Sequence, residues 1–333
     1  MVPPTSKDPS TLALVGGLLT LYLVWGSTYL AIRVAVETLP PFLMSGFRFL
    51  VASAIMIGLI AATRGLNFTW SQLRYNVLVG GCMLLGGNGL VAWAEQEISS
   101  GVATLVVSLS PLFIVLLDWS MLSLSGGKLG HRPALLTFIG IAVGCAGLAI
   151  LVGPDLFSSS AESNHFGRML ALVAACFFWA AGSLMIRYAR EPVEPFTGAA
   201  LQMFGGGVWL VLAGWLLGEG VGLDVRKFTT NSLLAWGYLV VAGSLIAFTT
   251  YVWLMKHYAP AVISTYSYIN PIVAVFLGWL ILDETINSRI FAASAVIVLG
   301  VALITISRSK SARKPRGTLP IDDRTNGSGK LGG

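Results

Sequence analysis

Ten long apolar runs constrain this chain more than any other feature of its sequence. Each run approaches the ~20 residues that a helix needs to cross the hydrocarbon core of a bilayer, where backbone polar groups must be satisfied within the segment. The runs are continuously apolar and lack the period-two alternation of a transmembrane β-strand. The predicted spans are 12–34, 41–62, 76–94, 99–122, 134–153, 168–188, 196–217, 232–254, 261–282 and 289–307. The sequence therefore predicts an all-α polytopic membrane protein with ten transmembrane helices.

The charge content agrees with this prediction. Only 11% of the residues are charged, against about 25% in an ordinary soluble domain, so a water-soluble enzyme is excluded as a class. Most charges lie between the runs, and Lys and Arg are more frequent on the side of the membrane that would hold the N-terminus. Because basic loops stay in the cytoplasm, we expect both termini to be cytoplasmic.

The spans divide the chain into predicted segments. Residues 1–11 are a cytoplasmic N-terminus, 12–153 hold the first five helices, 154–167 form a periplasmic linker and 168–307 hold the other five helices. Residues 308–333 form a tail that starts with the basic run RSKSARKPR and ends rich in Gly and Ser. A basic cluster beside a last helix favours binding to anionic lipids without requiring nucleic acid. The tail is predicted to be disordered.

The two groups of five helices are predicted to be copies of one unit. A shift of 154 positions places Trp25 on Trp179, and a shift of 160 positions places Pro111 on Pro271. Since each copy has an odd number of helices, the second enters the membrane from the opposite face. Inverted repeats of this kind build many secondary transporters, in which exchange of roles between the copies gives alternating access.

Three stretches carry a resemblance to a known family. The sequences WGSTYLAIR at 25–33, PPFLMSGFRFLVA at 40–52 and YSYINPIVAVFLGWLILDE at 266–284 resemble the EamA-type transporters of the drug/metabolite transporter superfamily. The likeness extends over residues 12–307. It implies ten transmembrane helices, a central cavity and export of small molecules across a bacterial inner membrane, with aromatic amino acids a favoured substrate class.

Aromatic and hydroxyl side chains deep in the spans are candidates for the wall of that cavity. Stacked rings would hold an aromatic or cationic substrate, at ~0.5–2 kcal/mol per contact. The alternative for the Trp and Tyr residues is the interfacial belt, where these residue types gather by default. The candidates are Trp25, Tyr29, Trp179, Ser183, Tyr251 and Tyr268.

Polar groups within the spans are the second set of candidates. Arg48 lies seven residues into the second span, where it could bind a substrate carboxylate or form a structural pair with Glu95 or with backbone carbonyls. Asn88 and Asn270 could orient a zwitterion. Ser108 belongs to a polar stripe that either faces the cavity or joins helices by hydrogen bonds.

Pro111 and Pro271 lie near the centres of the fourth and ninth spans. A proline frees the carbonyl four residues earlier and bends the helix. The pair could form hinges around the cavity, or each could be a packing kink. Gly140 and Gly144 form a GxxxG step that permits close helix contact. A step of this kind serves packing within a monomer, or a dimer seam as the alternative.

The sequence contains no Cys or His pattern with metal-ligand spacing, so no metal or cofactor is expected. With no carboxylate or histidine at the predicted midplane, proton coupling is expected to be weak or absent. The predicted function is export of small amphipathic metabolites, aromatic and neutral amino acids foremost, and related drugs. A membrane-embedded lipid-modifying enzyme is the alternative, but it needs a buried catalytic constellation.

Overall fold

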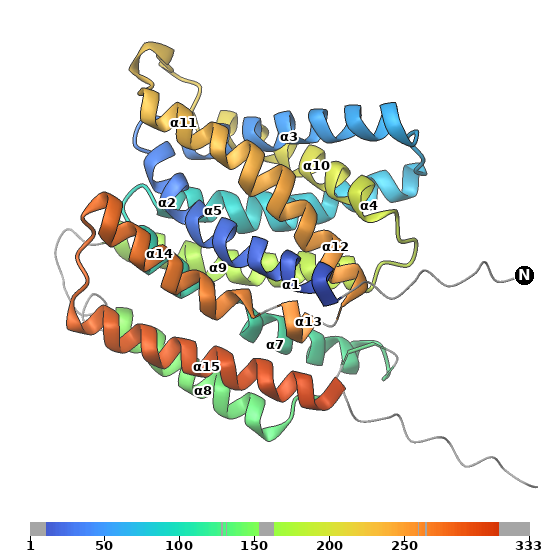
Figure 1. The fold of residues 1–333 in the computed structure, drawn as a ribbon, viewed down its shortest axis with the longest axis vertical. Coiled ribbons are helices and arrows are strands. Elements are labelled where there is room, and N and C mark those ends of the chain that lie inside the picture. Colours follow the sequence, from blue (N-terminus) through green and yellow to red (C-terminus); the bar gives the residue numbers. More distant parts are fainter. Residues whose placement is uncertain are drawn as a thin grey trace, which may run out of the picture.

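A computed structural model describes residues 11–127, 129–130, 132–152, 163–258, 260–263 and 265–312. In these residues the chain forms helices and connecting loops, with no strand. The helices lie roughly side by side, and the first one, α1 (Thr11–Thr20), begins at the end of the bundle where the last one, α15 (Ser288–Ala312), ends (Figure 1). The all-α class predicted from the sequence is confirmed.

The remaining regular helices follow the predicted spans in order. In the first half they are α2 (Gly26–Ala35), α3 (Pro41–Thr63), α4 (Trp70–Gly80), α5 (Leu90–Ala94), α6 (Ser100–Val107), α7 (Ser110–Leu124) and α8 (Leu135–Val152). In the second half they are α9 (Ser163–Arg187), α10 (Pro195–Leu216), α11 (Thr230–Tyr238), α12 (Thr249–His257), α13 (Pro260–Ile263) and α14 (Tyr266–Leu282), with a short 3₁₀ turn, η3 (Val225–Lys227), before α11.

Three spans contain a π-helical segment near their middle. These segments are η1 (Leu21–Trp25) between α1 and α2, η2 (Gly81–Gly89) between α4 and α5, and η4 (Leu239–Phe248) between α11 and α12. A π-helix is rare, usually short and frequent at functional sites. The three segments therefore single out one region of the bundle.

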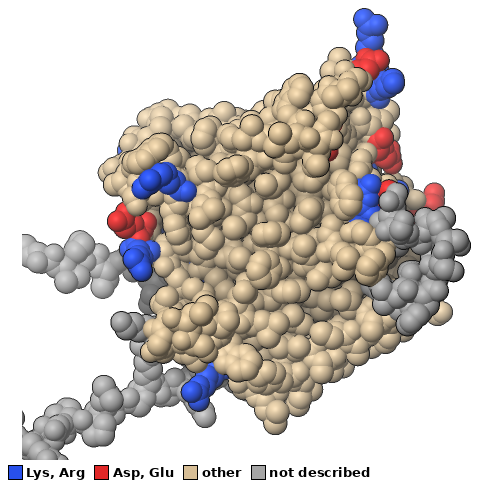
Figure 2. All heavy atoms as spheres, turned by 180° about the vertical axis from the view of Figure 1, so that it is seen from behind, with Lys and Arg blue, Asp and Glu red and all other residues tan. Residues whose placement is uncertain are grey.

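The described helices fit a membrane protein. Some labelled helices join end to end into longer stretches, such as Thr11–Ala35. By length and composition, seven such continuous stretches among the described residues can cross a bilayer, and three shorter apolar helices cover Leu135–Leu151, Ile269–Leu282 and Ser288–Ile304. Charged side chains gather at the two ends of the molecule, and the surface between them is uncharged on the face that Figure 2 shows. Apolar side chains such as Leu23, Leu59 and Leu280 are more than half exposed, as expected of a surface that faces lipid.

Several boundaries differ from the sequence prediction. The last helix, α15, continues to Ala312, so the start of the tail that was predicted to be disordered is helical at 308–312. The third span begins at Trp70 instead of 76, because Thr69 and Gln72 form a reciprocal capping box that starts α4 earlier. The sixth begins at Ser163, so the end of the segment predicted as a linker is helical. Residues 1–10, 153–162 and 313–333 lie outside the described part of the chain, and with them the predictions for both termini and most of the linker.

The GxxxG step of α8 is used within the chain. A Cβ atom placed on Gly140 would lie 2.8 Å from the Gly300 carbonyl oxygen of α15, and one on Gly147 would lie 2.6 Å from the Ile297 side chain. Gly300 in turn approaches the backbone of Gly144. Small residues on both helices thus let α8 and α15 pack at close range, along one side of the bundle (Figure 1).

Candidate functional site

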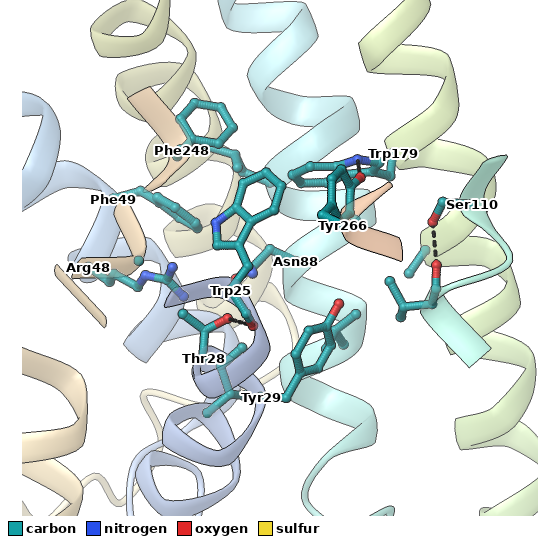
Figure 3. Close-up of a pocket in the computed structure, with 17 residues that line it drawn as sticks. Trp25, Thr28, Tyr29, Arg48, Phe49, Asn88, Ser110, Trp179, Phe248 and Tyr266 are labelled. Atoms are coloured by element: carbon teal, nitrogen blue, oxygen red, sulfur yellow. Dashed lines mark hydrogen bonds between the residues drawn. The ribbon is translucent and has the colours of Figure 1, made fainter. Parts of the chain in front are cut away.

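A pocket lies within the bundle where the three π-helical segments meet. It contains about 660 Å³ of empty space, including the part that opens to its surroundings. Both halves of the chain contribute to its wall (Figure 3). The lining residues are Trp25, Thr28, Tyr29, Ile32, Arg48, Phe49, Leu84, Gly87, Asn88, Val91, Val107, Ser110, Ala175, Trp179, Gly243, Phe248 and Tyr266.

The glycine-rich η2 segment allows its partner helix to come close to this pocket. A Cβ atom on Gly87 would lie 3.1 Å from the Trp179 ring, and one on Gly86 would lie 2.5 Å from the Phe178 ring. Because both glycines lack a side chain, α9 can place Trp179 directly against η2. The glycines that weaken this span as an apolar run therefore shape one wall of the pocket.

Four aromatic side chains form a contiguous cluster at the pocket. Trp25 of η1 lies 5.5 Å from Trp179, 5.0 Å from Tyr251 and 5.1 Å from Tyr266, measured between ring centroids. The Trp179 Nε1 atom donates a hydrogen bond of 3.2 Å to the Tyr266 hydroxyl. The Tyr251 hydroxyl lies 2.9 Å from the Ser183 hydroxyl. Edge-to-face and tilted rings at these distances attract one another, so the cluster is a cohesive aromatic wall.

Arg48 contributes a buried positive charge to the pocket. Its side chain is 3% exposed, its Nε atom donates a hydrogen bond of 2.8 Å to the Ser244 hydroxyl, and its guanidinium lies 4.7 Å from the centre of the Phe49 ring. Among the described residues no acidic side chain forms an ion pair with it. A buried cation without a counterion is costly in a membrane. Arg48 therefore creates a strong preference for an anionic group in this pocket.

The pocket holds unsatisfied hydrogen-bonding atoms of both kinds. The Nη1 atom of Arg48 is a buried donor without a protein acceptor, and the Oδ1 atom of Asn88 is a buried acceptor without a protein donor. Both side chains line the same pocket, close to Trp25 (Figure 3). Buried polar atoms are normally paired with protein, water or ligand. The two atoms together suit a ligand that carries an anionic acceptor and a donor.

The structure brings some of the sequence-predicted residues together and separates others. Trp25, Tyr29, Arg48, Asn88 and Trp179 line the pocket. Tyr251 belongs to the aromatic cluster but does not line the pocket, and its hydroxyl is joined to that of Ser183.

Two further candidates lie outside the wall, and a third is not described. Ser108 is buried and donates to the Leu105 carbonyl of its own helix, which is a local structural bond. In the amide orientation that satisfies its hydrogen bonds, the Asn270 side-chain nitrogen donates to the Tyr22 and Tyr266 carbonyls at 3.2 Å each. These bonds join α14 to η1. Tyr268 belongs to α14, and its side chain lies outside the described part of the structure.

Several lining residues were not among the sequence candidates. Thr28, Phe49, Phe248 and Ser110 carry no pattern that separates them from ordinary apolar or helix-bonding residues, and Tyr266 stands two positions before the ring candidate Tyr268. Phe49 could have been suspected because it directly follows Arg48, and an intramembrane charge is the clearest sequence signal of a site. The remaining members become visible only through the packing of distant helices.

The two prolines occupy different backbone settings. Pro111 lies in the first turn of α7, just after the short non-helical interruption between α6 and α7. The Ser110 hydroxyl donates a hydrogen bond of 2.6 Å to the Val107 carbonyl. Pro271 lies inside α14, one turn after that helix begins. The two prolines are therefore not equivalent: Pro271 is inside a helix, whereas Pro111 is at the start of one. The Val107 carbonyl, which was expected to be free, already accepts a hydrogen bond.

The structural pairing of Arg48 with Glu95 is not observed. Arg33 of α2 donates instead to the backbone carbonyl of Glu95, and Arg48 bonds to Ser244 of η4. Arg48 is thereby held toward the pocket, while Glu95 lies beyond the end of α5.

Two glutamates link the halves of the chain at the end of the bundle opposite the termini. The Glu219 carboxylate accepts hydrogen bonds from the backbone N–H groups of Phe42 and Leu43, which begin α3, at 3.1 and 2.8 Å. The Glu284 carboxylate accepts from the N–H and hydroxyl of Ser100, which begins α6, at 2.8 Å each. A carboxylate at a helix N-terminus satisfies orphan donors and complements the helix dipole. These contacts tie the two halves of the chain together at that end of the bundle.

Among the described residues, no group of three His, Cys, Asp or Glu side chains comes together. The arrangement is instead that of a binding site. It combines an aromatic wall, one buried cation and a buried acceptor in a pocket that both halves of the chain build.

Comparison with known proteins points in the same direction. The model of the EamA-like transporter family matches twice, at residues 13–153 and 166–306. The chain is 35% identical over 306 residues to the uncharacterized inner membrane transporter YedA of Escherichia coli K12, covering 91% of this chain and 94% of that protein. It is 23% identical over 300 residues to the uncharacterized transporter YoaV of Bacillus subtilis, covering 88% of this chain and 97% of that protein.

The fold has a solved counterpart. One crystal structure aligns with a TM-score of 0.63 at 23% sequence identity, covering 91% of this chain and 99% of that one. At this level of identity the likeness concerns the fold alone.

Proposed function

Because this chain belongs to the EamA-like transporter family of the drug/metabolite transporter superfamily, we propose that it exports small amphipathic metabolites, aromatic and neutral amino acids foremost, across a bacterial inner membrane. That it is a membrane transporter follows from family membership and from the apolar helices. The observation that carries the substrate class is the pocket, where unsatisfied Arg48 and Asn88 atoms lie beside an aromatic wall.

Each part of the pocket would recognise one part of an amino acid. The free Nη1 donor of Arg48 would bind the substrate carboxylate, and the Oδ1 acceptor of Asn88 would bind the ammonium group. Trp25, Trp179 and Tyr266 would contact the side chain by offset or edge-to-face packing.

We further propose that the pocket opens alternately to the two sides of the membrane, in a bundle of ten helices built as two inverted five-helix repeats. Support comes from the twofold match of the family model and from contacts between helices at equivalent places in the two halves, α3 with α10 and α8 with α15. The carboxylate contacts of Glu219 and Glu284 would close one end and break when that end opens.

We propose cytoplasmic termini on the basis of the loop charges, a tail that binds anionic lipids, and a monomer as the working unit. The monomer is favoured because the α8 glycines already pack against α15 of the same chain. No cofactor is required by this mechanism, since the substrate is moved and not chemically changed.

A counterflow screen tests the proposal. The purified protein would be reconstituted in liposomes loaded with one unlabelled compound, and uptake of its labelled form would be followed across amino acids, purines and cationic drugs. We expect transient accumulation with aromatic and neutral amino acids that stops at equal specific activity inside and outside. Protein-free liposomes are the control. Absence of exchange across the whole panel, with protein that is folded and inserted, would contradict the proposal.

A further inference from the structure

Glu95 is a buried carboxyl group at the edge of the membrane domain. It directly follows α5 and is 0% exposed, although its position in the sequence suggests a loop residue in water. Neither Oε1 nor Oε2 has a hydrogen-bond partner in the described structure. Leaving a charge in such a place costs several kcal/mol, so the group would sooner hold a proton than stay ionised.

The charged groups around Glu95 do not compensate a negative charge on it. Arg33 of α2 is directed to the Glu95 backbone carbonyl, with no ion pair to the carboxylate among the described residues. Arg168 of α9 is engaged with the Trp93 carbonyl and with Glu97, the latter at 3.0 Å.

The group on the other side is itself acidic. Glu284, from the segment between α14 and α15, is held in place by donors from Ser100 and Gly101 of α6. Asp283, next to Glu284, and Arg289, at the start of α15, are further charged residues of this segment. Burial, followed by repulsion from Glu284, raises the pKa of Glu95 well above its ordinary value, and Arg33 opposes this shift in part.

Glu95 is directly connected to the wall of the pocket. Its backbone N–H donates to the carbonyl of Val91, which lines the pocket one turn earlier, at 2.9 Å. Tyr29, another lining residue, packs against the apolar cluster that contains Val91 and Ala94. Glu95 is therefore one helical turn away from a residue that lines the pocket.

We propose that Glu95 is a proton-binding site that couples closure of this end of the bundle to the uptake of one proton. The inference rests on the proposed transport function and goes beyond it. When this end opens, water reaches the carboxyl group, its O–H bond breaks, and the proton passes to water while Arg33 faces the carboxylate. When the end closes, the O–H bond forms again.

The sign of the pH dependence follows from this exchange. Since the closed state binds the proton more tightly than the open state, acidic pH favours closure and rising pH favours the open state. Exchange needs repeated closure, so its rate should fall as the pH rises. This revises the expectation of weak or absent proton coupling, which considered only carboxylates at the midplane and counted Glu95 as a loop residue.

The protonation state can be measured without any transport. Infrared difference spectra of the purified full-length protein, recorded between acidic and alkaline pH, should show the stretching band of a buried protonated carboxyl group. The band should be missing in Glu95→Gln and present in Glu97→Gln, a neighbouring glutamate that forms an ion pair. In Glu284→Gln the band should titrate at lower pH, since the repelling charge is gone. A band that Glu95→Gln leaves unchanged would overturn the proposal, and so would an unchanged titration in Glu284→Gln.

Counterflow then tests the coupling. Wild-type exchange should slow as the pH rises equally on both sides of the membrane, while Glu95→Gln, which is always neutral, should keep its low-pH rate. A Glu95→Gln variant that slows as the wild type does would contradict the inference. If no compound is exchanged by either protein, the proposed function fails, and the infrared band alone decides whether Glu95 binds a proton.

Discussion

Trp25 and Trp179 meet edge to face, with ring centroids 5.5 Å apart and an angle of 80° between the ring planes. The two residues are 154 positions apart, which is the shift that superposes the start of the first half on the start of the second in the sequence. One ring comes from η1 and the other from α9, so two residues that this shift superposes meet in the wall of one pocket. If that wall binds substrate, both halves of the chain contact the same substrate molecule.

Replacing Trp25 with Ala should weaken substrate binding. The change removes ring contacts to Trp179, Tyr251 and Tyr266, each worth about 0.5–1.5 kcal/mol. We expect the half-saturating concentration of an aromatic amino acid in counterflow to rise by roughly tenfold, the equivalent of about 1.4 kcal/mol. Trp215→Ala is the matched control, because Trp215 is 59% exposed on α10. Equal effects of the two changes would argue against an aromatic substrate wall.

Arg48→Met should abolish the preference for a substrate with a carboxylate. A hydrogen bond to a charged group contributes about 1.5–3 kcal/mol, so wild-type protein should prefer an amino acid over its decarboxylated amine by roughly 10- to 100-fold. The preference is read from competition of the two compounds in counterflow. Arg64→Met, at the exposed end of the same helix, should retain it. An Arg48→Met protein that keeps the wild-type preference would show that Arg48 does not contact the carboxylate.

The two prolines should respond differently to replacement by Ala. Pro271 lies inside α14, where Ala would restore a donor for the Ser267 carbonyl and stiffen the helix. Pro111 lies in the first turn of α7, where a missing N–H has little consequence. We expect Pro271→Ala to slow turnover and raise the melting temperature without changing half-saturation, and Pro111→Ala to remain near wild type. Equal slowing by both changes would restore the symmetric hinge expected from the sequence.

The close contact between α8 and α15 should not tolerate a large side chain. Gly140→Leu would place new atoms against the Gly300 carbonyl and the Ile304 side chain, and overpacking of this kind costs about 1–3 kcal/mol. Thermal unfolding in detergent should show a lower midpoint for Gly140→Leu. Gly58→Leu is the control, since nothing lies within 4 Å of the Cβ position there. A stable Gly140→Leu protein would mean that α8 and α15 separate easily.

Most of the helices could be predicted from the sequence, because a bilayer imposes long apolar segments and leaves few alternatives. The π-helical segments could not be predicted, since the composition of η2 and η4 carries no signal that distinguishes a π-helix from an α-helix. The early start of α4 depends on the local capping box of Thr69 and Gln72. A prediction based only on the length of apolar segments does not take such a cap into account.

The pocket was predicted in part. Trp25, Trp179, Arg48 and Asn88 stand out in sequence because large rings, charges and amides are conspicuous inside apolar runs. Glu95 was missed because sequence position alone places it in a loop, whereas in the structure its side chain is fully buried. Burial by distant elements is the property that local pattern reading cannot supply.

Alternating access requires that one pocket be reached from both sides of the membrane. Thr28 lines this pocket, so a Thr28→Cys protein, with its three native cysteines replaced by Ala, would report access to it. The measurement is labelling by a membrane-impermeant thiol reagent, applied to oriented vesicles from the outside or from the inside. We predict labelling from either side, slowed in both cases by a transported amino acid. Labelling from one side only, unchanged by any substrate that exchanges, would contradict alternating access through this pocket.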